Sequence, residues 1–292
     1  MKVDIAIKVE NLKKSYGNNY VVKGISFEVL KGETFALLGV NGAGKTTTLE
    51  CIEGIRKFDS GNVSVDGSIG VQLQSTSLYA NIKAKEAFIL FCKWNHTDPN
   101  WQLFDDFGIT EFQDLEYREM STGQKRRLHL AIALINDPDI IFLDEPTAGL
   151  DVEGRSALHD EIRKLKKQGK TILIASHDMA EVETLSDRIA ILKEGNIAFL
   201  GTSKQLTTVF STGLEIHIKT SKPLDLFQLD NSTYIGSVKE YESFKTEKLG
   251  EGLLELLQSI KNTGNQVLDI RIMHPTLEQK FIDIAKGVNG TE

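Results

Sequence analysis

The stretch from Phe35 to Thr48, FALLGVNGAGKTTT, constrains what this chain can fold into more than any other part of the sequence. An apolar run, residues 35–38, is followed by a glycine-rich segment, residues 39–46, and then by residues that suit the start of a helix. The order of strand, glycines, Lys-Thr and helix is the pattern of a phosphate-binding P-loop. We therefore predict a strand, a phosphate-binding turn and a helix in this stretch.

The residue types explain how such a turn binds phosphate. Glycines let the backbone turn tightly, so that successive N–H groups point at phosphate oxygens, and the helix start adds its positive dipole end. Lys45 can reach the β- and γ-phosphates, Thr46 offers a hydroxyl to Mg²⁺, and Thr47 can support phosphate contacts. An incidental glycine-rich turn is disfavoured, because every part arrives in the required order. The predicted nucleotide-contacting residues of the turn are Gly39, Asn41, Gly42, Ala43, Gly44, Lys45, Thr46 and Thr47.

Composition restricts the class of protein. The chain has 292 residues, 40% hydrophobic and 26% charged, which is typical of a globular protein of about two domains. A net charge of −7 argues against a dedicated nucleic-acid binder. No apolar run approaches the roughly 18 residues of a membrane span, so we expect a soluble cytoplasmic chain whose membrane role comes through a partner. Cys51 and Cys92 lack CxxC spacing, which favours buried free thiols over a disulfide or metal site.

Two acids close another predicted strand. Residues 140–143 are apolar, as in a fully buried parallel strand, and Asp144 and Glu145 follow them. Beside a P-loop, Asp144 is suited to hold Mg²⁺ and Glu145 to polarise an attacking water. A further buried strand, residues 171–175, ends next to His177, which should therefore reach a γ-phosphate from the same sheet edge. Taken singly, these residues could also be a solvated strand end and a structural histidine.

Two other segments are less specific by themselves. The run Ser121-Thr122-Gly123-Gln124 is a polar glycine turn that opens a helix to about residue 135. A serine hydroxyl and a glycine N–H at a helix N-terminus make an anion site, although an ordinary capping turn has the same composition. Tyr16 lies in a predicted turn, where it either stacks on a nucleotide base or is a surface residue.

The remaining chain divides into strands, a helical insertion and a tail. Residues 3–9 and 25–30 alternate like half-buried antiparallel strands, which we expect beside the P-loop strand. Residues 75–135 form a mostly helical insertion, with a second helix predicted to start at Asp98-Pro99. We expect the insertion's aromatic residues in the core, an exposed docking surface being the alternative. They are Phe88, Phe91, Trp94, Trp101, Phe104 and Phe107.

From about residue 211 the pattern is that of a small α+β unit. Residues 214–220 and 267–272 alternate like strands, and residues 253–260 have helical spacing. The run Thr276-Leu277-Glu278-Gln279 looks like a capping box that opens a last helix.

Together these pieces resemble the ATP-binding subunit of an ABC transporter over residues 3 to about 205, most like the antibiotic, peptide or multidrug exporter branch. The resemblance implies an α/β fold: a P-loop NTPase cassette with a mixed-sheet core, an antiparallel β subdomain and a helical subdomain. The cassette would span residues 1–210, with its helical subdomain at about 75–135. An accessory C-terminal domain for dimerisation or regulation would span residues 211–292.

The resemblance also assigns roles to residues. Tyr16 corresponds to the aromatic residue that stacks on adenine, residues 39–46 to the Walker A loop, and Asp144-Glu145 to the Walker B pair. The run from Ser121 to Gln124 resembles the family signature, residues 149–151 the D-loop, and His177 the switch histidine. In this scheme the nucleotide also contacts Ser121, Gly123, Gln124 and Asp151.

Two glutamines compete for the Q-loop position. We choose Gln74 over Gln72, because family members place a glutamine four residues after the glycine of an Ile-Gly pair, here Gly70. The resemblance makes Gln74 a metal ligand with Thr46 and Asp144. It also groups Gln74 with the catalytic residues Glu145 and His177.

Two positions depart from the family pattern. Thr122 stands where the signature usually has a first glycine, while Ser121 and Gly123, to which the resemblance assigns the γ-phosphate contacts, are present. Gly149 stands where the D-loop usually has alanine or serine, as is common in the exporter branch.

The implied mechanism is a sandwich of two cassettes. ATP on one P-loop is covered by the signature of a second copy or a paralogue, and hydrolysis with Glu145 as base releases the pair. The cofactors would be ATP and Mg²⁺, and separate transmembrane permease subunits would hold the chain at the cytoplasmic face and export a drug, antibiotic, peptide or lipid-like substrate. The alternative is a soluble ABC ATPase acting on nucleic acid or ribosomes. Such relatives typically have paired cassettes, coiled-coil insertions or zinc-binding cysteines, none of which the sequence contains, so we expect no nucleic-acid partner.

Overall fold

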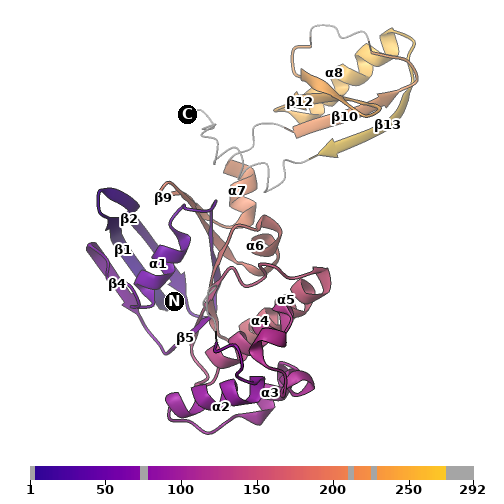
Figure 1. Ribbon diagram of the computed structural model, residues 1–292. Coiled ribbons are helices and arrows are strands. Elements are labelled where there is room, and N and C mark those ends of the chain that lie inside the picture. The colour runs from indigo at the N-terminus through magenta and orange to yellow at the C-terminus, as the bar shows by residue number, and fades with distance from the viewer. Residues whose placement is uncertain (1–3, 73–77, 210–213, 225–228, 274–292) are drawn as a thin grey trace. The chain divides into compact units, whose positions relative to one another are not determined.

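The computed structural model describes residues 4–72, 78–209, 214–224 and 229–273 (Figure 1). Two compact units make up the chain, Met1–Thr202 and Ser203–Glu292. The division falls a few residues before the expected domain limit at residue 210. Over the described ranges, no helix is both long and apolar enough to cross a bilayer. Cys51 and Cys92 are buried and free, which confirms that prediction.

A six-stranded sheet forms the centre of the first unit, in the order β5-β6-β7-β3-β8-β9. All neighbours pair in parallel except β8 and β9, which pair antiparallel. Every residue of β3, β6 and β7 is buried, as their unbroken apolar runs predict. The strands are β3 (Thr34–Leu38), β5 (Ile69–Gln72), β6 (Ile140–Asp144), β7 (Thr171–Ser176), β8 (Arg188–Lys193) and β9 (Asn196–Gly201).

The register brings the predicted catalytic strand ends to one edge of this sheet. Leu38 of β3 pairs with Ser176 of β7, and Asp144 of β6 pairs with Ala175 of β7. The P-loop, the Walker B acids and the switch histidine therefore all follow carboxyl ends at the same edge, where ligands bind in open parallel sheets.

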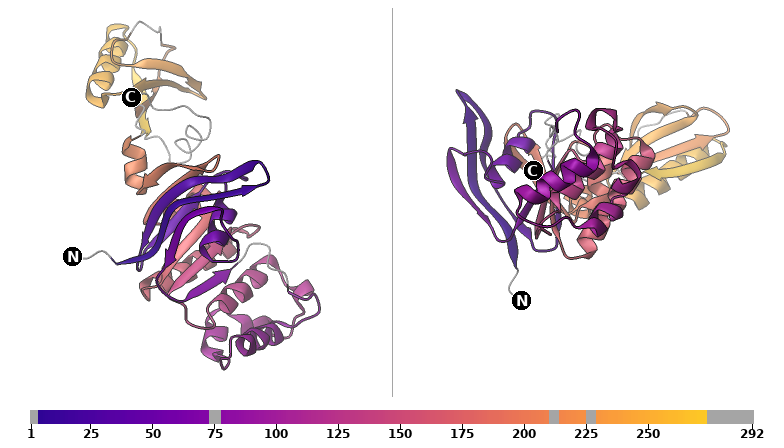
Figure 2. Two further views of the ribbon diagram at one scale, coloured as in Figure 1. Left: turned by 90° about the vertical axis from the view of Figure 1, so that its left-hand side faces the viewer. Right: turned by 60° about the horizontal axis from the view of Figure 1, so that its bottom comes forward.

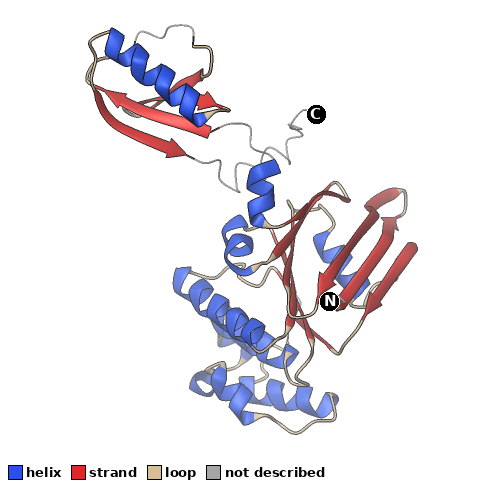
Figure 3. Cartoon of the chain, turned by 180° about the vertical axis from the view of Figure 1, so that it is seen from behind, coloured by secondary structure: helices blue, strands red, loops and turns tan. Residues whose placement is uncertain are grey.

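A separate three-stranded antiparallel sheet, in the order β2-β1-β4, covers one side of the unit. Its strands are β1 (Ile5–Tyr16), β2 (Asn19–Leu30) and β4 (Ser60–Val65). The predicted antiparallel pairing of β1 with β2 is confirmed. These strands do not hydrogen-bond to β3, because β7 and β8 occupy both of its edges, and they pack against it from a separate sheet. Helix α1 (Lys45–Ile52) lies between the two sheets (Figures 2 and 3). It shares one core with them, in which Phe27 stacks on Phe35.

Helices dominate the segment between β5 and β6. They are α2 (Ala84–Trp94), α3 (Trp101–Asp106), the short 3₁₀ turns η1 (Ile109–Phe112) and η2 (Tyr117–Glu119), and α4 (Thr122–Ala133). Helix α3 begins after Asn100, whose side chain accepts a hydrogen bond from the Leu103 N–H, so the predicted start at Asp98-Pro99 is wrong. The aromatic residues are divided between core and surface: Phe88, Phe104 and Phe107 are buried, whereas Trp94 is 77% exposed.

One helix follows the carboxyl end of β6 and another follows that of β7. Helix α5 (Val152–Lys167) is capped by Asp151, which accepts a hydrogen bond from the Gly154 N–H. Helix α6 (Met179–Leu185) is capped by Asp178, directly after His177.

The second unit is a four-stranded antiparallel sheet with one long helix. The strand order is β11-β12-β10-β13, and α8 packs on the sheet through Leu256 and Ile260, which contact Ile216, Ile218 and Phe244. The predicted strands at 214–220 and 267–272 are confirmed, and the predicted helix is longer than expected. The last predicted helix, from residue 276, lies outside the described residues. The elements are α7 (Ser203–Val209), β10 (Leu214–Thr220), β11 (Thr233–Val238), β12 (Tyr241–Thr246), α8 (Leu249–Asn262) and β13 (Val267–Met273).

Candidate functional site

The glycine-rich turn joins β3 to α1, and its backbone accounts for the glycines. Gly42 and Gly44 have φ values of 83° and 104°, in the left-handed region that favours glycine. A Cβ at Gly44 would also lie 2.8 Å from the Val21 carbonyl oxygen, and one at Gly39 would lie 2.7 Å from that of Leu192. Around Gly42, by contrast, the same position is open. The turn is therefore packed from behind and open on the side where a phosphate would approach.

Lys45 is held inside this turn. Its Nζ donates to the Gly39 carbonyl at 2.8 Å and to the Val40 carbonyl at 3.4 Å, and it lies 3.5 Å from Oε1 of Glu145. A polyanion entering the turn would take over this buried ammonium from its carbonyl and carboxylate partners. The cavity in front of the turn has a volume of about 220 Å³. It is lined by Val21, Asn41, Gly42, Gly44, Lys45, Thr46, Thr47, Glu145 and His177.

Glu145 and His177 meet at the mouth of this cavity. His177 Nδ1 lies 2.7 Å from Oε2 of Glu145, and the Glu145 N–H donates to the Ala175 carbonyl at 2.9 Å. Glu145 has a φ of 49°, a left-handed conformation that costs a non-glycine residue about 1–2 kcal/mol. Strained residues of this kind cluster at functional sites. The structure thus brings three of the predicted residues, Lys45, Glu145 and His177, into contact.

Asp144 lies behind Glu145 and next to Thr46. Its Oδ1 is buried without a hydrogen-bond partner in the described part of the chain. Burial raises the pKa of Asp144, and a hydrogen bond from the Thr46 side chain lowers it. An orphaned carboxylate oxygen beside a threonine hydroxyl fits the oxygen-only preference of Mg²⁺. Gln74, predicted as both ligand and catalytic residue, lies outside the described residues.

The protein alone does not complete a metal site here. Among the residues that the structure describes, no three His, Cys, Asp or Glu side chains gather closely enough to hold an ion. A magnesium ion at Asp144 and Thr46 would therefore also need phosphate oxygens and water, which is its usual arrangement in nucleotide sites.

Tyr16 stands at the tip of the β1–β2 hairpin, outside the lining of the P-loop cavity. Its ring is 45% exposed, and two cations lie over it: Lys14 Nζ is 5.6 Å and the Arg56 guanidinium 5.3 Å from the ring centroid. The ring is thus anchored by cation–π contacts and accessible to a base that extends from the cavity.

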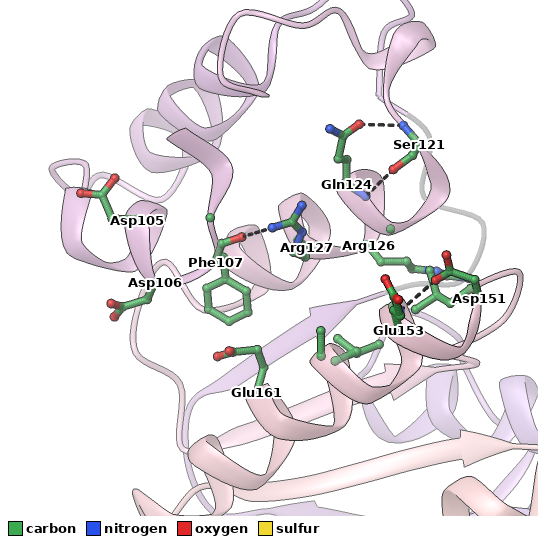
Figure 4. Close-up of a pocket in the computed structure, with 16 residues that line it drawn as sticks. Asp105, Asp106, Phe107, Ser121, Gln124, Arg126, Arg127, Asp151, Glu153 and Glu161 are labelled. Carbon is green, nitrogen blue, oxygen red and sulfur yellow. Dashed lines mark hydrogen bonds between the residues drawn. The ribbon is translucent and has the colours of Figure 1, made fainter. Parts of the chain in front are cut away.

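The signature turn is a well-formed helix cap. Ser121 Oγ accepts from the Gln124 N–H at 3.2 Å, and Gln124 Oε1 accepts from the Ser121 N–H at 2.8 Å (Figure 4). The turn thus has the hydrogen bonds of a capping box, and the Gln124 side chain, predicted to contact the nucleotide, is used within the turn. Gly123 differs from Gly39 and Gly44 of the P-loop, because an added Cβ would meet no atom closer than 3.8 Å. It also differs from Gly42, because its φ is not positive. Nothing in the described chain requires a glycine there.

This turn faces a cavity of its own. A hollow of about 500 Å³ lies between the start of α4, the end of α3, and the D-loop with α5 (Figure 4). Ser121, Gly123, Gln124 and Asp151 line it, and no residue of the P-loop does. Within one chain, the predicted nucleotide contacts thus form two separate groups.

The two departures from the family pattern are neighbours. A Cβ at residue 149 would lie 3.5 Å from Cγ2 of Thr122, and Gly149 has a φ of 77°. The larger residue in the signature therefore faces the smaller one in the D-loop.

Sequence reasoning missed the contact between β5 and α4. Gln72 is buried, and its Nε2 donates to the Arg126 carbonyl at 3.1 Å. Burial lowers the pKa of the Arg126 guanidinium, which lines the signature cavity. The signal for Gln72 was a polar residue inside an otherwise apolar strand, but nothing in the sequence identified its partner.

Comparisons with known proteins agree with this site. The family model described as ABC transporter matches residues 22–148. The linearmycin resistance ATP-binding protein LnrL of Bacillus subtilis is 30% identical over 303 residues, covering 95% of this chain and 97% of that protein. The Nod factor export ATP-binding protein I of Burkholderia orbicola is 39% identical over 207 residues, covering 65% of this chain and 68% of that protein.

Solved structures show the same fold. The dimeric structure of a bacterial ABC transporter cassette matches with a TM-score of 0.62 and 25% identity, covering 67% of this chain and 98% of that one. The ADP conformation of an ATP-binding cassette of an ABC transporter matches with a TM-score of 0.62 and 22% identity, covering 69% and 92%. The predicted α/β P-loop cassette fold is confirmed. Because the likeness to LnrL runs over nearly the whole of both proteins, this chain belongs to the ATP-binding proteins of ABC transporters, a family of ATPases.

Proposed function

We propose that this chain powers an ABC exporter by closing, with a second cassette, around two ATP molecules. The observation that carries the proposal is that the predicted nucleotide-contacting residues line two separate cavities, one at the P-loop and one at the signature. A single chain supplies both halves of a site but does not bring them together. A second cassette, either an identical copy or a paralogue, completes each site.

Gly123 supports this arrangement. Its surroundings leave room for a side chain, so a glycine is explained by something that approaches from outside the described chain. The hydroxyl of Ser121 and the first N–H groups of α4 form an anion site. The γ-phosphate of an ATP bound to the partner's P-loop is the anion that we assign to it.

The catalytic steps use residues that already touch. Lys45 exchanges its carbonyl and carboxylate contacts for the β- and γ-phosphates, and Glu145 accepts a proton from the attacking water. His177 holds Glu145 through the 2.7 Å contact and reaches toward the γ-phosphate. Thr46, Asp144 and Gln74 would hold Mg²⁺, which neutralises charge on the phosphates. Tyr16 stacks on adenine.

Membrane subunits on separate chains would carry the substrate. Exposed aromatic residues on the helical part, Tyr79 and Trp94, offer an apolar surface for a permease, which would hold the cassette at the cytoplasmic face. Relatives named for linearmycin resistance and Nod factor export support an exported drug, antibiotic, peptide or lipid-like substrate.

Since LnrL aligns over the C-terminal unit as well, we assign that unit a dimerisation or regulatory role within the same branch. No observation favours the nucleic-acid alternative.

ATP-driven dimerisation of a Glu145→Gln variant tests the proposal. The variant keeps its P-loop but lacks the base, so ATP should accumulate and hold two cassettes together, while turnover falls by roughly 10²–10⁴-fold. Analytical ultracentrifugation should show a monomer without nucleotide and a dimer with ATP and Mg²⁺.

A second substitution separates the two half-sites. Ser121→Ala in the Glu145→Gln background should prevent the dimer without weakening ATP binding to the P-loop, and Ser64→Ala, on an exposed β4 residue, should leave the dimer intact. A Glu145→Gln protein that binds ATP and stays monomeric, alone and with its membrane subunits, would refute the sandwich.

A further inference from the structure

A buried carboxyl that the proposed mechanism does not use lies behind the catalytic turns. Glu181, in the first turn of α6, is 2% exposed. Ser176 Oγ donates to its Oε2 at 2.5 Å. The Thr147 side chain lies near enough to the carboxyl to lower its pKa. The other oxygen, Oε1, has no hydrogen-bond partner in the described chain and lies 3.9 Å from His159 Nε2.

The two hydroxyl residues belong to the two turns that carry the proposed base and the switch histidine. Thr147 follows Glu145 by two residues, and its buried side chain lies in the turn closed by the Ala148 N–H donating to the Glu145 carbonyl at 3.2 Å. Ser176 directly precedes His177 at the end of β7. One carboxyl therefore lies against both turns, and it is not among the residues that line the nucleotide cavity.

Ser176 extends this contact to the rest of the site. Its Oγ also accepts from the Asp178 N–H at 3.0 Å, and its carbonyl accepts from the Gly39 N–H at 3.3 Å. The switch turn and the first glycine of the P-loop are thus fixed to the same residue that donates to Glu181.

The base needs such support. Glu145 holds a left-handed φ of 49°, and a strained residue keeps its conformation only when its surroundings enforce it. The hydrogen bonds within the turn fix its backbone locally, and the Thr147 side chain connects it to helix α6. Without that connection the turn can relax, and the 2.7 Å contact between Glu145 and His177 would lengthen.

A packing role alone does not explain a carboxyl in this place. Burial raises the pKa of Glu181 to about 6, against the opposing effect of the Ser176 and Thr147 hydrogen bonds. Burying an ionisable group costs free energy that an apolar side chain of similar size would not cost. Leucine or methionine would fill the same space but could not accept hydrogen bonds from two hydroxyls.

We propose that Glu181 is a positioning residue for ATP hydrolysis, which holds the Glu145 turn through Thr147 and the His177 turn through Ser176. The inference rests on the proposed roles of Glu145 and His177. Glu181 does not line the nucleotide cavity. It therefore affects the rate of ATP turnover and not the affinity of the P-loop for ATP.

The test compares Glu181→Ala with Glu181→Gln in the full chain. The alanine leaves both hydroxyls without an acceptor, and a misplaced catalytic group should lower kcat by about 10–100-fold. The dissociation constant for ATP should change by less than about 3-fold, since the P-loop contacts remain. Glutamine keeps an acceptor oxygen and should restore most of the rate. Glu183→Ala, on an exposed residue of the same helix, is the matched control and should behave like the parent protein.

Amide hydrogen exchange supplies a measurement that needs no turnover. In Glu181→Ala, the amides of residues 145–150 and 176–178 should exchange faster together, while those of the remaining central sheet keep the parental rate. Thr147→Val should accelerate only the first of these two segments.

The outcomes separate this inference from the proposed function. A parent protein without ATPase activity would count against the proposed function, and the exchange pattern would still decide the role of Glu181. Parental kcat and parental exchange in Glu181→Ala would overturn the inference. Equal losses in the alanine and glutamine variants, with faster exchange throughout the unit, would overturn it as well, because they indicate general destabilisation.

Discussion

Acid should destabilise the cassette through His129, a buried histidine on α4. The side chain is 6% exposed, its ring stacks on that of Tyr117 with centroids 5.6 Å apart, and Nε2 lies 3.2 Å from the Tyr117 hydroxyl. Burial, followed by the charges of Arg126 and Lys125, lowers the pKa of His129 from 6.5 to about 4. The folded chain therefore keeps this imidazole neutral at a pH where the unfolded chain would protonate it.

The sign and size of the effect follow from this difference. Above about pH 6.5 the lowered pKa does not change the free energy of unfolding. That free energy decreases as the pH falls from there towards 4, because the unfolded state binds the proton first. At about 1.4 kcal/mol per pKa unit, the difference between 6.5 and about 4 amounts to about 3.4 kcal/mol in full, and to about 2 kcal/mol at pH 5. For a unit of this size, about 2 kcal/mol lowers the Tm by roughly 4–8 °C.

Thermal unfolding of His129→Gln and the parent protein at pH 8 and pH 5 measures this contribution. Glutamine cannot titrate, so the stability of the variant relative to the parent should improve by about 2 kcal/mol between pH 8 and pH 5, whatever its cost at pH 8. His96→Gln, on an exposed histidine, is the control and should show no such change. A difference between His129→Gln and the parent that is the same at both pH values would refute the reasoning.

Two further predictions concern the P-loop and the helix behind it. Lys45→Ala removes the ammonium that lies between the P-loop carbonyls and Glu145, so calorimetry should detect no ATP binding; an unchanged affinity would dismiss its role. Glu53→Gln should change the free energy of unfolding with pH in the opposite direction to His129→Gln. Burial, followed by the charge of Asp144, raises the pKa of Glu53 to about 7. Neither of its carboxyl oxygens has a hydrogen-bond partner in the described chain. The cost of ionising Glu53 grows as the pH rises from about 4.5 to 7, so glutamine should stabilise the protein by up to about 3 kcal/mol at pH 8 and by little at pH 4. A gain of equal size at both pH values in urea unfolding would contradict this.

The parts of the fold that the sequence predicted well are those in which every side chain has the same environment. Strands β3, β6 and β7 are buried on both faces, so their apolar runs identify them without knowledge of their neighbours. The P-loop is equally predictable, because its glycines are required by the backbone conformation of a few neighbouring residues.

Long-range contacts decided what the sequence could not. Alternation in residues 3–9 and 25–30 shows that one face is buried, but it does not say which sheet the strands join. Trp94 has the helical spacing of a core residue and is nevertheless on the surface. Spacing shows which residues share one face of a helix, but it does not show what packs against that face. Gln72 and Glu181 are polar residues whose importance comes from atoms more than one element away, Arg126 for the first and Thr147 for the second.

In the proposed mechanism, the contact between Lys45 and Glu145 couples nucleotide binding to the release of the base from its cation. Without nucleotide, the Lys45 ammonium lies 3.5 Å from the Glu145 carboxylate, so the proposed base is paired with a cation. An arriving triphosphate draws the ammonium away and leaves Glu145 with His177 alone. The carboxylate is thus released from its cation only once a triphosphate is bound, and in an empty cassette the proposed base stays paired.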